Sequence, residues 1–436
     1  MKKLICLVLV LTLALSMAAC GGSKKTTITF WSTPILPEAE LQAFVDEFEA
    51  ANENIDVELE FQTWEGIPEK LQIALTSGDT PDVYFDGAAR TASLPALDVL
   101  VPVDDIMGKF NDWNESVMSF GVKDGTHYLI PASQMGASFV TVNVSLAKEL
   151  GIYDLLPEDR ISWTIHDFYN FCKAATENGA DRGIKGVVLY AGSSTSDDIL
   201  YSFMLSNGGQ IIDKENNVCV ANSPECVEAV EVLGNIVKDG YAIDGAAMLT
   251  GADTGTPFYN SQCVVVINSA APNVMTEMQK MVDEGYLDTL PEIATYGVPT
   301  AEGLQMDSAC WGANGIAIFD NDDEAKAEAA KAFVTFLMEK VEFSEAVWKA
   351  VPNYYPSRNN GAKFNSDNEA MKAEVLYRQE LTAKYADFDF GILDNYWPEV
   401  RNYFYPELQA VYSGQKTAQE AMDSFAAHVN EILANQ

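Results

Sequence analysis

The sequence has few basic residues and few histidines. Lys and Arg number 27 against 64 Asp and Glu, which gives a formal net charge of −37. Such a surface repels nucleic-acid phosphates and anionic lipid headgroups, so nucleic acid is excluded as a partner, whereas a neutral ligand meets no such repulsion. The histidines His127, His166 and His428 are far apart, and no H-E-x-x-H, G-x-S-x-G or phosphate-loop motif occurs. We therefore predict a non-enzymatic protein without catalytic residues, cofactor or metal.

The seven cysteines have no C-x-x-C spacing, which excludes a zinc ribbon and a dense disulfide framework. Cys219 and Cys226 are close enough in sequence to form one disulfide, and the sequence leaves this open. Cys172 falls on an apolar helical stripe and Cys263 begins an apolar strand, so both are predicted to be small core residues.

Long apolar runs are also missing, except at the N-terminus. There, Lys2-Lys3 precede an apolar run from Leu4 to Leu15, which is typical of a secretory signal and short for a membrane-spanning helix. The small residues before Cys20 resemble the bacterial lipobox, which implies diacylation of this cysteine. We predict a signal peptide over 1–19 and a lipidated polar tether over 20–26, on the outer face of the cell membrane. The alternative is a secreted protein that is cut near Ala19 and keeps a free Cys20.

A chain of 436 residues exceeds the size at which single cores stop growing, so two lobes are expected. Strand patterns at 27–31, 55–61 and 81–85 alternate with helical patterns that begin at Pro37 and Ile67. This order predicts an α/β fold with a parallel sheet, whose ligands bind at the carboxyl ends of the strands. Those ends carry Trp31, Trp64-Glu65 and Asp86.

Capping signals place further helices along the second half of the chain. Thr164 with Asp167 resembles a capping box, and Ser223-Pro224 supplies an N-cap followed by a proline in the first turn. Helical patterns also cover 323–340 and the end of the chain after Thr417. Short apolar strands are predicted at 138–142, 186–190, 263–267, 294–299 and 314–319.

The collinear order of several short motifs covers the whole mature chain. They are Ile28-Thr29-Phe30-Trp31, the run from Lys70 to Val83, Tyr128-Leu129-Ile130-Pro131, Thr141-Val142-Asn143, Ser162-Trp163-Thr164, Asn207-Gly208-Gly209, Trp311 to Ile318, and Thr417 to Met422. In this order the chain resembles the extracellular solute-binding proteins of ABC transporters, in the family of the maltose-type sugar binders. Departures from the family pattern are Val142 in place of a tyrosine and Cys310 in place of a glycine.

The resemblance implies a two-lobe periplasmic-binding-protein-like fold of type II. Each lobe would be a mainly parallel sheet flanked by helices, and a hinge of crossing segments would let the lobes close on a ligand. The matched motifs put the crossings near 137–142, 310–314 and 352–358. Lobe 1 is then expected to hold 27–137 plus 315–351, and lobe 2 to hold 138–314 plus 352–436.

Sugar binding requires aromatic faces for the C–H side of the ring together with polar groups for its hydroxyls. Residues of both kinds occupy the expected loop positions and form the predicted ligand site: Trp31, Trp64, Glu65, Asp86, Arg90, Gln134, Asn268, Ser269, Trp311, Gly312, Arg358, Asn395 and Trp397. The alternative for each tryptophan is a place in the core, and this is favoured for Trp163 and Trp348. Asp86 and Arg90 are alternatively a surface pair or helix-cap residues.

By resemblance, the expected function is capture of a carbohydrate, in particular an oligosaccharide, for delivery to an ABC permease by a monomeric, lipid-anchored receptor. An exported glycosidase and a surface adhesin are the alternatives. A glycosidase needs two positioned carboxylates. Among 64 acidic residues a suitable pair can always be found, so the sequence gives no evidence for this alternative. Asp387, Asp389 and Asp394 lack the glycine and the terminal glutamate of an EF-hand loop, so a solvated acidic loop is predicted there.

Overall fold

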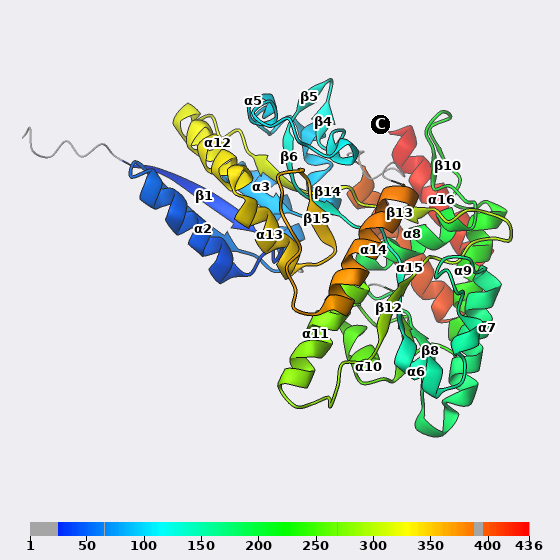
Figure 1. The fold of residues 1–436 in the computed structure, drawn as a ribbon. Coiled ribbons are helices and arrows are strands. Elements are labelled where there is room, and N and C mark those ends of the chain that lie inside the picture. The colour runs from blue at the N-terminus through cyan, green and yellow to red at the C-terminus, as the bar shows by residue number, and fades with distance from the viewer. Residues whose placement is uncertain (1–24, 65, 268, 388–395, 436) are drawn as a thin grey trace, which may run out of the picture.

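The structure is a computed structural model, and it describes residues 25–64, 66–267, 269–387 and 396–435. The predicted signal peptide and Cys20 lie outside the described residues. Two separate sheets, each with its own helices, form the two masses seen in Figure 1. The chain is thus an α/β protein with two lobes, which we call lobe 1 and lobe 2 after the sheet that each contains.

The sheet of lobe 1 has six strands in the order β15-β6-β14-β3-β1-β2. Their bounds are β1 Thr26–Ser32, β2 Ile55–Phe61, β3 Val83–Asp86, β6 Leu129–Met135, β14 Ala313–Ile318 and β15 Tyr354–Pro356. The strict alternation of apolar and acidic residues over 55–61 becomes an edge strand, β2, whose outward side chains are exposed. Strands β1, β3 and β6 all end on the side of the sheet that faces lobe 2.

Helices cover both faces of this sheet. Phe30 and Phe85 face a core formed with α2 (Glu38–Ala51), α12 (Glu324–Glu339) and α13 (Val341–Ala350). Trp31 and Tyr84 are the sequence neighbours of Phe30 and Phe85, so they point to the opposite face of the sheet. There they pack in a second core with α3 (Ile67–Ser77) and α4 (Ala88–Thr91). As predicted, α3 ends at Gly78, whose φ of 74° is the left-handed conformation that glycine adopts at helix ends.

The sheet of lobe 2 has four strands in the order β12-β7-β11-β8. They are β7 Val140–Asn143, β8 Lys185–Val188, β11 Cys263–Val266 and β12 Ile293–Tyr296. Each of these four strands is almost wholly buried, as their continuous apolar runs predict. Two small strands, β13 Ser308–Ala309 and β16 Ala386–Asp387, pair beside this lobe.

The expected mainly parallel sheets are mixed in the structure. Within the two large sheets, parallel pairing is limited to β2-β1-β3 and to β11-β8, whereas β14 and β7 pair antiparallel with both of their neighbours. The physical reason is connectivity. Strands β7 and β14 enter their sheets through a crossing, at the edge where the other strands end, and β15 begins at the same edge after α13. These three strands therefore run in the opposite direction.

The helices of lobe 2 begin at the predicted caps. Thr164 and Asp167 form the capping box of α7 (Ile165–Asn178), and the Ser223 hydroxyl caps α9 (Pro224–Lys238). Thr417 and Glu420 form a further capping box at the start of α16 (Ala418–Ala434). The remaining main helices of this lobe are α6 Val144–Glu149, α8 Asp197–Ser206, α10 Gly255–Tyr259, α11 Ala271–Asp283, α14 Glu369–Tyr385 and α15 Trp397–Tyr412.

Three segments pass between the two sheets. One joins β6 to β7, one leads from β13 into β14, and the last follows β15 toward α14. Strand β15 lies in the first sheet, although the expected division of the chain assigns everything after residue 351 to lobe 2. The rest of the expected division stays a prediction.

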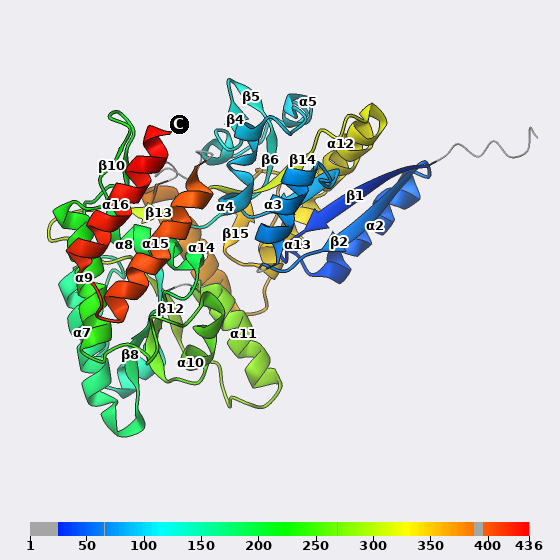
Figure 2. The ribbon, with the colours of Figure 1, turned by 180° about the vertical axis from the view of Figure 1, so that it is seen from behind.

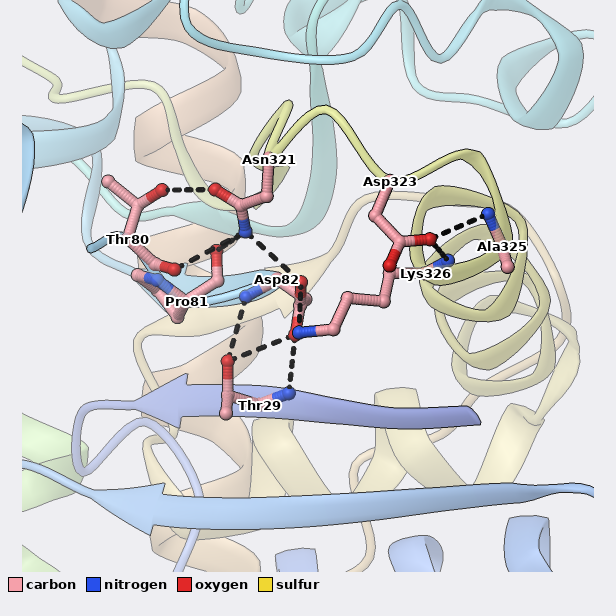
Figure 3. A network of polar contacts seen from close by, with 8 residues as sticks. All are labelled: Thr29, Thr80, Pro81, Asp82, Asn321, Asp323, Ala325 and Lys326. Atoms are coloured by element: carbon pink, nitrogen blue, oxygen red, sulfur yellow. Dashed lines mark hydrogen bonds and ion pairs between the residues drawn. The ribbon is translucent and has the colours of Figure 1, made fainter. Parts of the chain in front are cut away.

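A buried carboxylate just before β3 ties three segments of lobe 1 together beside the middle of β1 (Figure 3). Asp82 is 2% exposed and accepts hydrogen bonds from the backbone N–H and the hydroxyl of Thr29. It also accepts from the Asn321 amide at 3.1 Å and from the Lys326 ammonium at 3.0 Å. Lys326 is on α12, whose N-cap is Asp323, so the network fixes the start of this helix against the sheet.

The five cysteines that the structure describes are all buried and free, so Cys219 and Cys226 are not bridged. Cys172 and Cys263 are core residues, as predicted, and so are Trp163 and Trp348. Within the described ranges no group of His, Cys, Asp and Glu has the arrangement of a metal site. Over the same ranges no helix combines the length and the apolar character needed to cross a membrane.

Candidate ligand-binding site

Asp86 is the last residue of β3, at the edge of the lobe 1 sheet that faces lobe 2. Its side chain is fully buried and accepts hydrogen bonds from the Thr33 hydroxyl at 2.9 Å and from the backbone N–H of Gly87 at 2.7 Å. The Tyr84 hydroxyl also donates to it. Burial first, and then the charge of Asp86, raise the pKa of Tyr84, so this hydroxyl stays protonated and remains a donor.

Arg90 pairs with Asp86 from one turn further on, in the short helix α4. Its guanidinium reaches both carboxylate oxygens, with Nη2 at 2.6 Å from Oδ1. Burial opposes the charged form of Arg90, but the charge and the hydrogen bonds of Asp86 outweigh this, so the pKa of Arg90 is raised. Its guanidinium carbon also lies 5.2 Å from the ring centroid of Trp64, which is 36% exposed. The structure therefore brings Trp64, Asp86 and Arg90 together.

Trp31 lies deeper in the same lobe. It is 7% exposed and belongs to the core, and the ammonium of Lys70 on α3 lies 3.9 Å from its ring centroid. Lys70 in turn forms an ion pair with Glu60 at the surface. The ring of Trp31 is thus covered by Lys70, whose side chain has a flexible four-carbon stem and a charged end.

A second cluster of an aromatic ring and an ion pair belongs to lobe 2. It lies between the crossing segment 310–314 and helix α15. The guanidinium carbon of Arg401, on α15, lies 4.7 Å from the ring centroid of Trp311. Both oxygens of the buried Asp197 accept hydrogen bonds from Arg401, at 2.6 and 2.7 Å. Trp397 begins α15 and is 1% exposed, with its ring 5.6 Å from that of Tyr201.

The two clusters act on one another through their charges. Burial and, to a smaller extent, the positive charge of Arg401 lower the pKa of Arg90, although the charge and hydrogen bonds of Asp86 outweigh both effects. Figure 2 shows α4 on the lobe 1 side and α15 on the lobe 2 side of the same face of the molecule. Each lobe thus contributes an aromatic ring beside a bidentate Asp–Arg pair.

A pocket of about 180 Å³ lies where the crossing segments meet, and we call it the hinge pocket. It is formed by the first two crossings, the segment that leads into β15, the β11–α11 loop and residues of α8, α11 and α14: Met135, Gly136, Ala137, Ser138, Phe139, Ile199, Ile267, Ser269, Ala270, Asn273, Trp311, Val351, Asn353, Tyr354 and Arg378. It therefore contains two of the predicted ligand residues, Ser269 and Trp311. The backbone carbonyl of Ser269 accepts a hydrogen bond from the Thr141 hydroxyl at 2.6 Å.

The other predicted residues lie in different surroundings. Gln134 is near the end of β6, and its side chain accepts from the Ser116 hydroxyl at 3.1 Å. Gly312 has φ 83°, and its carbonyl accepts from the N–H of Met135. Arg358 is away from both clusters, because it pairs with Asp112 at 2.7 Å and stacks on Phe110 inside lobe 1. Glu65, Asn268 and Asn395 lie outside the described residues.

Sequence reasoning missed three buried charged residues near this site. They are Asp197, Arg401 and Arg378, which are 0%, 8% and 2% exposed. Arg401 follows Trp397 by four residues in a helical pattern and therefore lies on the same face of the helix. From this spacing, Arg401 could have been predicted as a neighbour of Trp397. For Asp197 and Arg378 the sequence contains no comparable signal.

The comparisons with known proteins agree on one family. The sequence model of the family described as bacterial extracellular solute-binding protein matches residues 34–341. The diacetylchitobiose binding protein DasA of Streptomyces coelicolor is 28% identical over 252 residues, a match that spans about half of each chain, 53% of this one and 55% of DasA. The sn-glycerol-3-phosphate-binding periplasmic protein UgpB of Escherichia coli K12 is 24% identical over 97% of this chain and 96% of its own.

Solved structures share the fold. A solute-binding protein of an ABC transporter from Thermotoga lettingae, bound with α-D-tagatose, superposes with a TM-score of 0.77 at 15% identity. The superposition covers 94% of this chain and all of the other. Two lobes, crossing strands and the matched span of 308 residues lead to the same conclusion: this chain belongs to the family of bacterial extracellular solute-binding proteins.

Proposed function

We propose that the protein captures a carbohydrate between its two lobes and passes it unchanged to the permease of an ABC importer. The observation that carries this proposal is the pair of matched clusters, Trp64 with Asp86 and Arg90 on lobe 1, and Trp311 with Asp197 and Arg401 on lobe 2. Aromatic faces suit the C–H side of a sugar ring, and charged groups in fixed pairs suit its hydroxyls.

The names of the similar proteins support the same class of ligand. DasA is named for diacetylchitobiose, and the Thermotoga lettingae protein contains tagatose. UgpB is named for a phosphorylated polyol, so the class extends to small hydroxylated compounds in general. Binding to both lobes would stabilise the closed form, and this form would then be recognised by the permease.

Trp31, Trp64, Asp86, Arg90, Ser269 and Trp311 form the ligand site in this proposal, with Asp197 and Arg401 added from the structure. Trp397 and Gln134 belong to its supporting wall. The protein is proposed to act as a monomer whose lobes follow the division given by the two sheets. Cys20 is proposed to hold it on the cell membrane through a lipid.

The experiment is a thermal-shift screen of the mature chain against mono- and oligosaccharides. A ligand that binds only the folded protein raises its melting temperature, so carbohydrate binding predicts a saturable increase. Each hit is then incubated with the protein and recovered for mass spectrometry. Intact ligand supports capture. Cleaved ligand, or the absence of a shift with every saccharide, contradicts the proposal.

A further inference from the structure

The hinge pocket contains a buried cation without a matching anion. Arg378, on α14, is 2% exposed. Its Nε donates to the Asn353 side-chain oxygen and its Nη2 to the Ala137 carbonyl, both at 3.1 Å. Its third nitrogen, Nη1, has no hydrogen-bond partner among the described residues.

All hydrogen-bond acceptors around Arg378 are neutral. The acid on its face of the helix is Glu374, one turn earlier. This carboxylate is already engaged by Arg160 and by the backbone N–H of Thr295 at 2.9 Å. Burial lowers the pKa of the Arg378 guanidinium, and the nearby Tyr355 and Glu374 offset this only in part, in contrast to Arg90 with its paired aspartate. An uncompensated buried charge is costly, so an anion beside Nη1 would remove a large part of that cost.

A second feature of the same pocket favours an anion. Helix α11 begins at the pocket, and its N-cap residue, Ala270, has no side chain that could cap it. The N–H groups of a first helical turn have no partner within the helix and carry a partial positive charge. Asn273, in this turn, also lines the pocket. Pro272 has no N–H, so the N–H groups that this turn can offer are those of Ala271 and Asn273.

We propose that the hinge pocket binds an oxyanion, a carboxylate or a phosphate, between Nη1 of Arg378 and the start of α11. The pocket of about 180 Å³ accepts such a group, since it equals the liquid volume of about six waters at ~30 Å³ each. The oxyanion is either a free ion or an acidic group carried by the captured sugar. The second source rests on the proposed function, whereas the first does not.

The test uses the mature chain and two single substitutions. Asn273→Asp adds a negative charge at the pocket but leaves the hydrogen bonds of Arg378 to the crossing segments intact. Asn235→Asp is the matched control, because Asn235 is also a half-buried helical asparagine but lies on α9, away from the hinge. Isothermal titration calorimetry with inorganic phosphate is run in low-salt buffer, and again with sodium chloride at equal ionic strength to separate binding from screening.

A free ion predicts saturable phosphate binding that Asn273→Asp weakens by about tenfold or more and that Asn235→Asp leaves unchanged. An acidic group on the cargo predicts that glucuronate binds but glucose does not, with the same response to the two substitutions. If neither phosphate nor glucuronate binds, or if both substitutions act equally, the oxyanion site is wrong. The response to neutral oligosaccharides, measured on the same samples, tests the proposed function separately.

Discussion

The guanidinium carbon of Arg401 lies 4.7 Å from the centre of the Trp311 ring. The arginine comes from α15 near the end of the chain, and the tryptophan comes from the segment that crosses into lobe 1. Arg401 is held in place by Asp197, so the ring face of Trp311 is fixed by a buried ion pair from lobe 2. This contact links the position of one crossing to the helix that also carries Trp397.

Loss of one charge from this ion pair is expected to destabilise the protein. Asp197→Asn leaves Arg401 buried without its counter-charge, and we expect a loss of about 3 kcal/mol in the free energy of unfolding. Urea denaturation followed by circular dichroism measures it. Asp56→Asn, which breaks the exposed pair with Lys25, is the control and should leave the unfolding free energy unchanged within error. Equal effects of both substitutions would contradict a structural role for the buried pair.

Trp64 is the exposed aromatic of the proposed site, so it can be removed without damage to the core. Trp64→Ala is expected to weaken binding of any saccharide identified in the screen by about tenfold, with the melting temperature of the free protein unchanged. Tyr286→Ala is the control, because Tyr286 is 74% exposed and lies at the end of α11. Calorimetry measures the affinity of the natural protein and of both variants. Full affinity in Trp64→Ala would mean that Trp64 does not contact the ligand.

The Asp82 network predicts two substitutions of different cost. Asp82→Ala removes a buried acceptor of four hydrogen bonds and leaves Lys326 without its carboxylate, for an expected loss of about 3 kcal/mol. Asp323→Ala removes only the N-cap of α12 and is expected to cost about 1 kcal/mol. Chemical denaturation of both variants tests this ranking, and the reverse order would mean that the network does not stabilise lobe 1.

The buried cysteines are expected to be unreactive in the folded protein. A thiol reacts as its thiolate, and burial raises the pKa of Cys219 to about 11, so at pH 8 this group is protonated as well as covered. Iodoacetamide should therefore label none of the five described cysteines before unfolding and all five afterwards. Labelling of only three after unfolding without reductant would indicate a bridge between Cys219 and Cys226.

The lipid anchor is tested by a substitution outside the described residues. In cells that make the full chain, Cys20→Ala removes the thiol to which lipid would be attached. The variant is expected in the soluble extracellular or periplasmic fraction, and the natural chain in the membrane fraction, as followed by immunoblotting. Identical fractionation of the two proteins would support the secreted alternative.

Local signals in the sequence predicted much of the secondary structure. The capping boxes at Thr164 and Thr417 and the glycine end of α3 at Gly78 are confirmed, because each depends on residues within a few positions of one another. Alternation of apolar and polar residues likewise located β1 and β2. The direction of β7 and β14 was not predicted, since it depends on where the chain crosses between sheets and not on local composition.

The site was predicted less completely than the fold. Asp86 and Arg90 are four residues apart and their pairing could be inferred, but Asp197 and Arg401 are 204 residues apart and meet only through the packing of α8 and α15. The contacts of Trp397 with Tyr201 are of the same kind. Whether Trp397 or Arg358 contacts a ligand stays a prediction.

Gly136 is the single residue between the end of β6 and Ala137, and Ala137 is bound to α14 on both sides of its backbone, through Arg378 and the Thr382 hydroxyl. A Cβ at Gly136 would lie 2.2 Å from the Asn353 side-chain oxygen, so no larger residue fits there without movement of the Asn353 side chain. That oxygen also accepts a hydrogen bond from Nε of Arg378, and the Gly136 N–H donates to the Asn353 carbonyl, so Gly136 joins the first crossing to the segment that leads into β15. A bulkier residue at Gly136 would therefore displace the Asn353 side chain and disturb its hydrogen bond with Arg378.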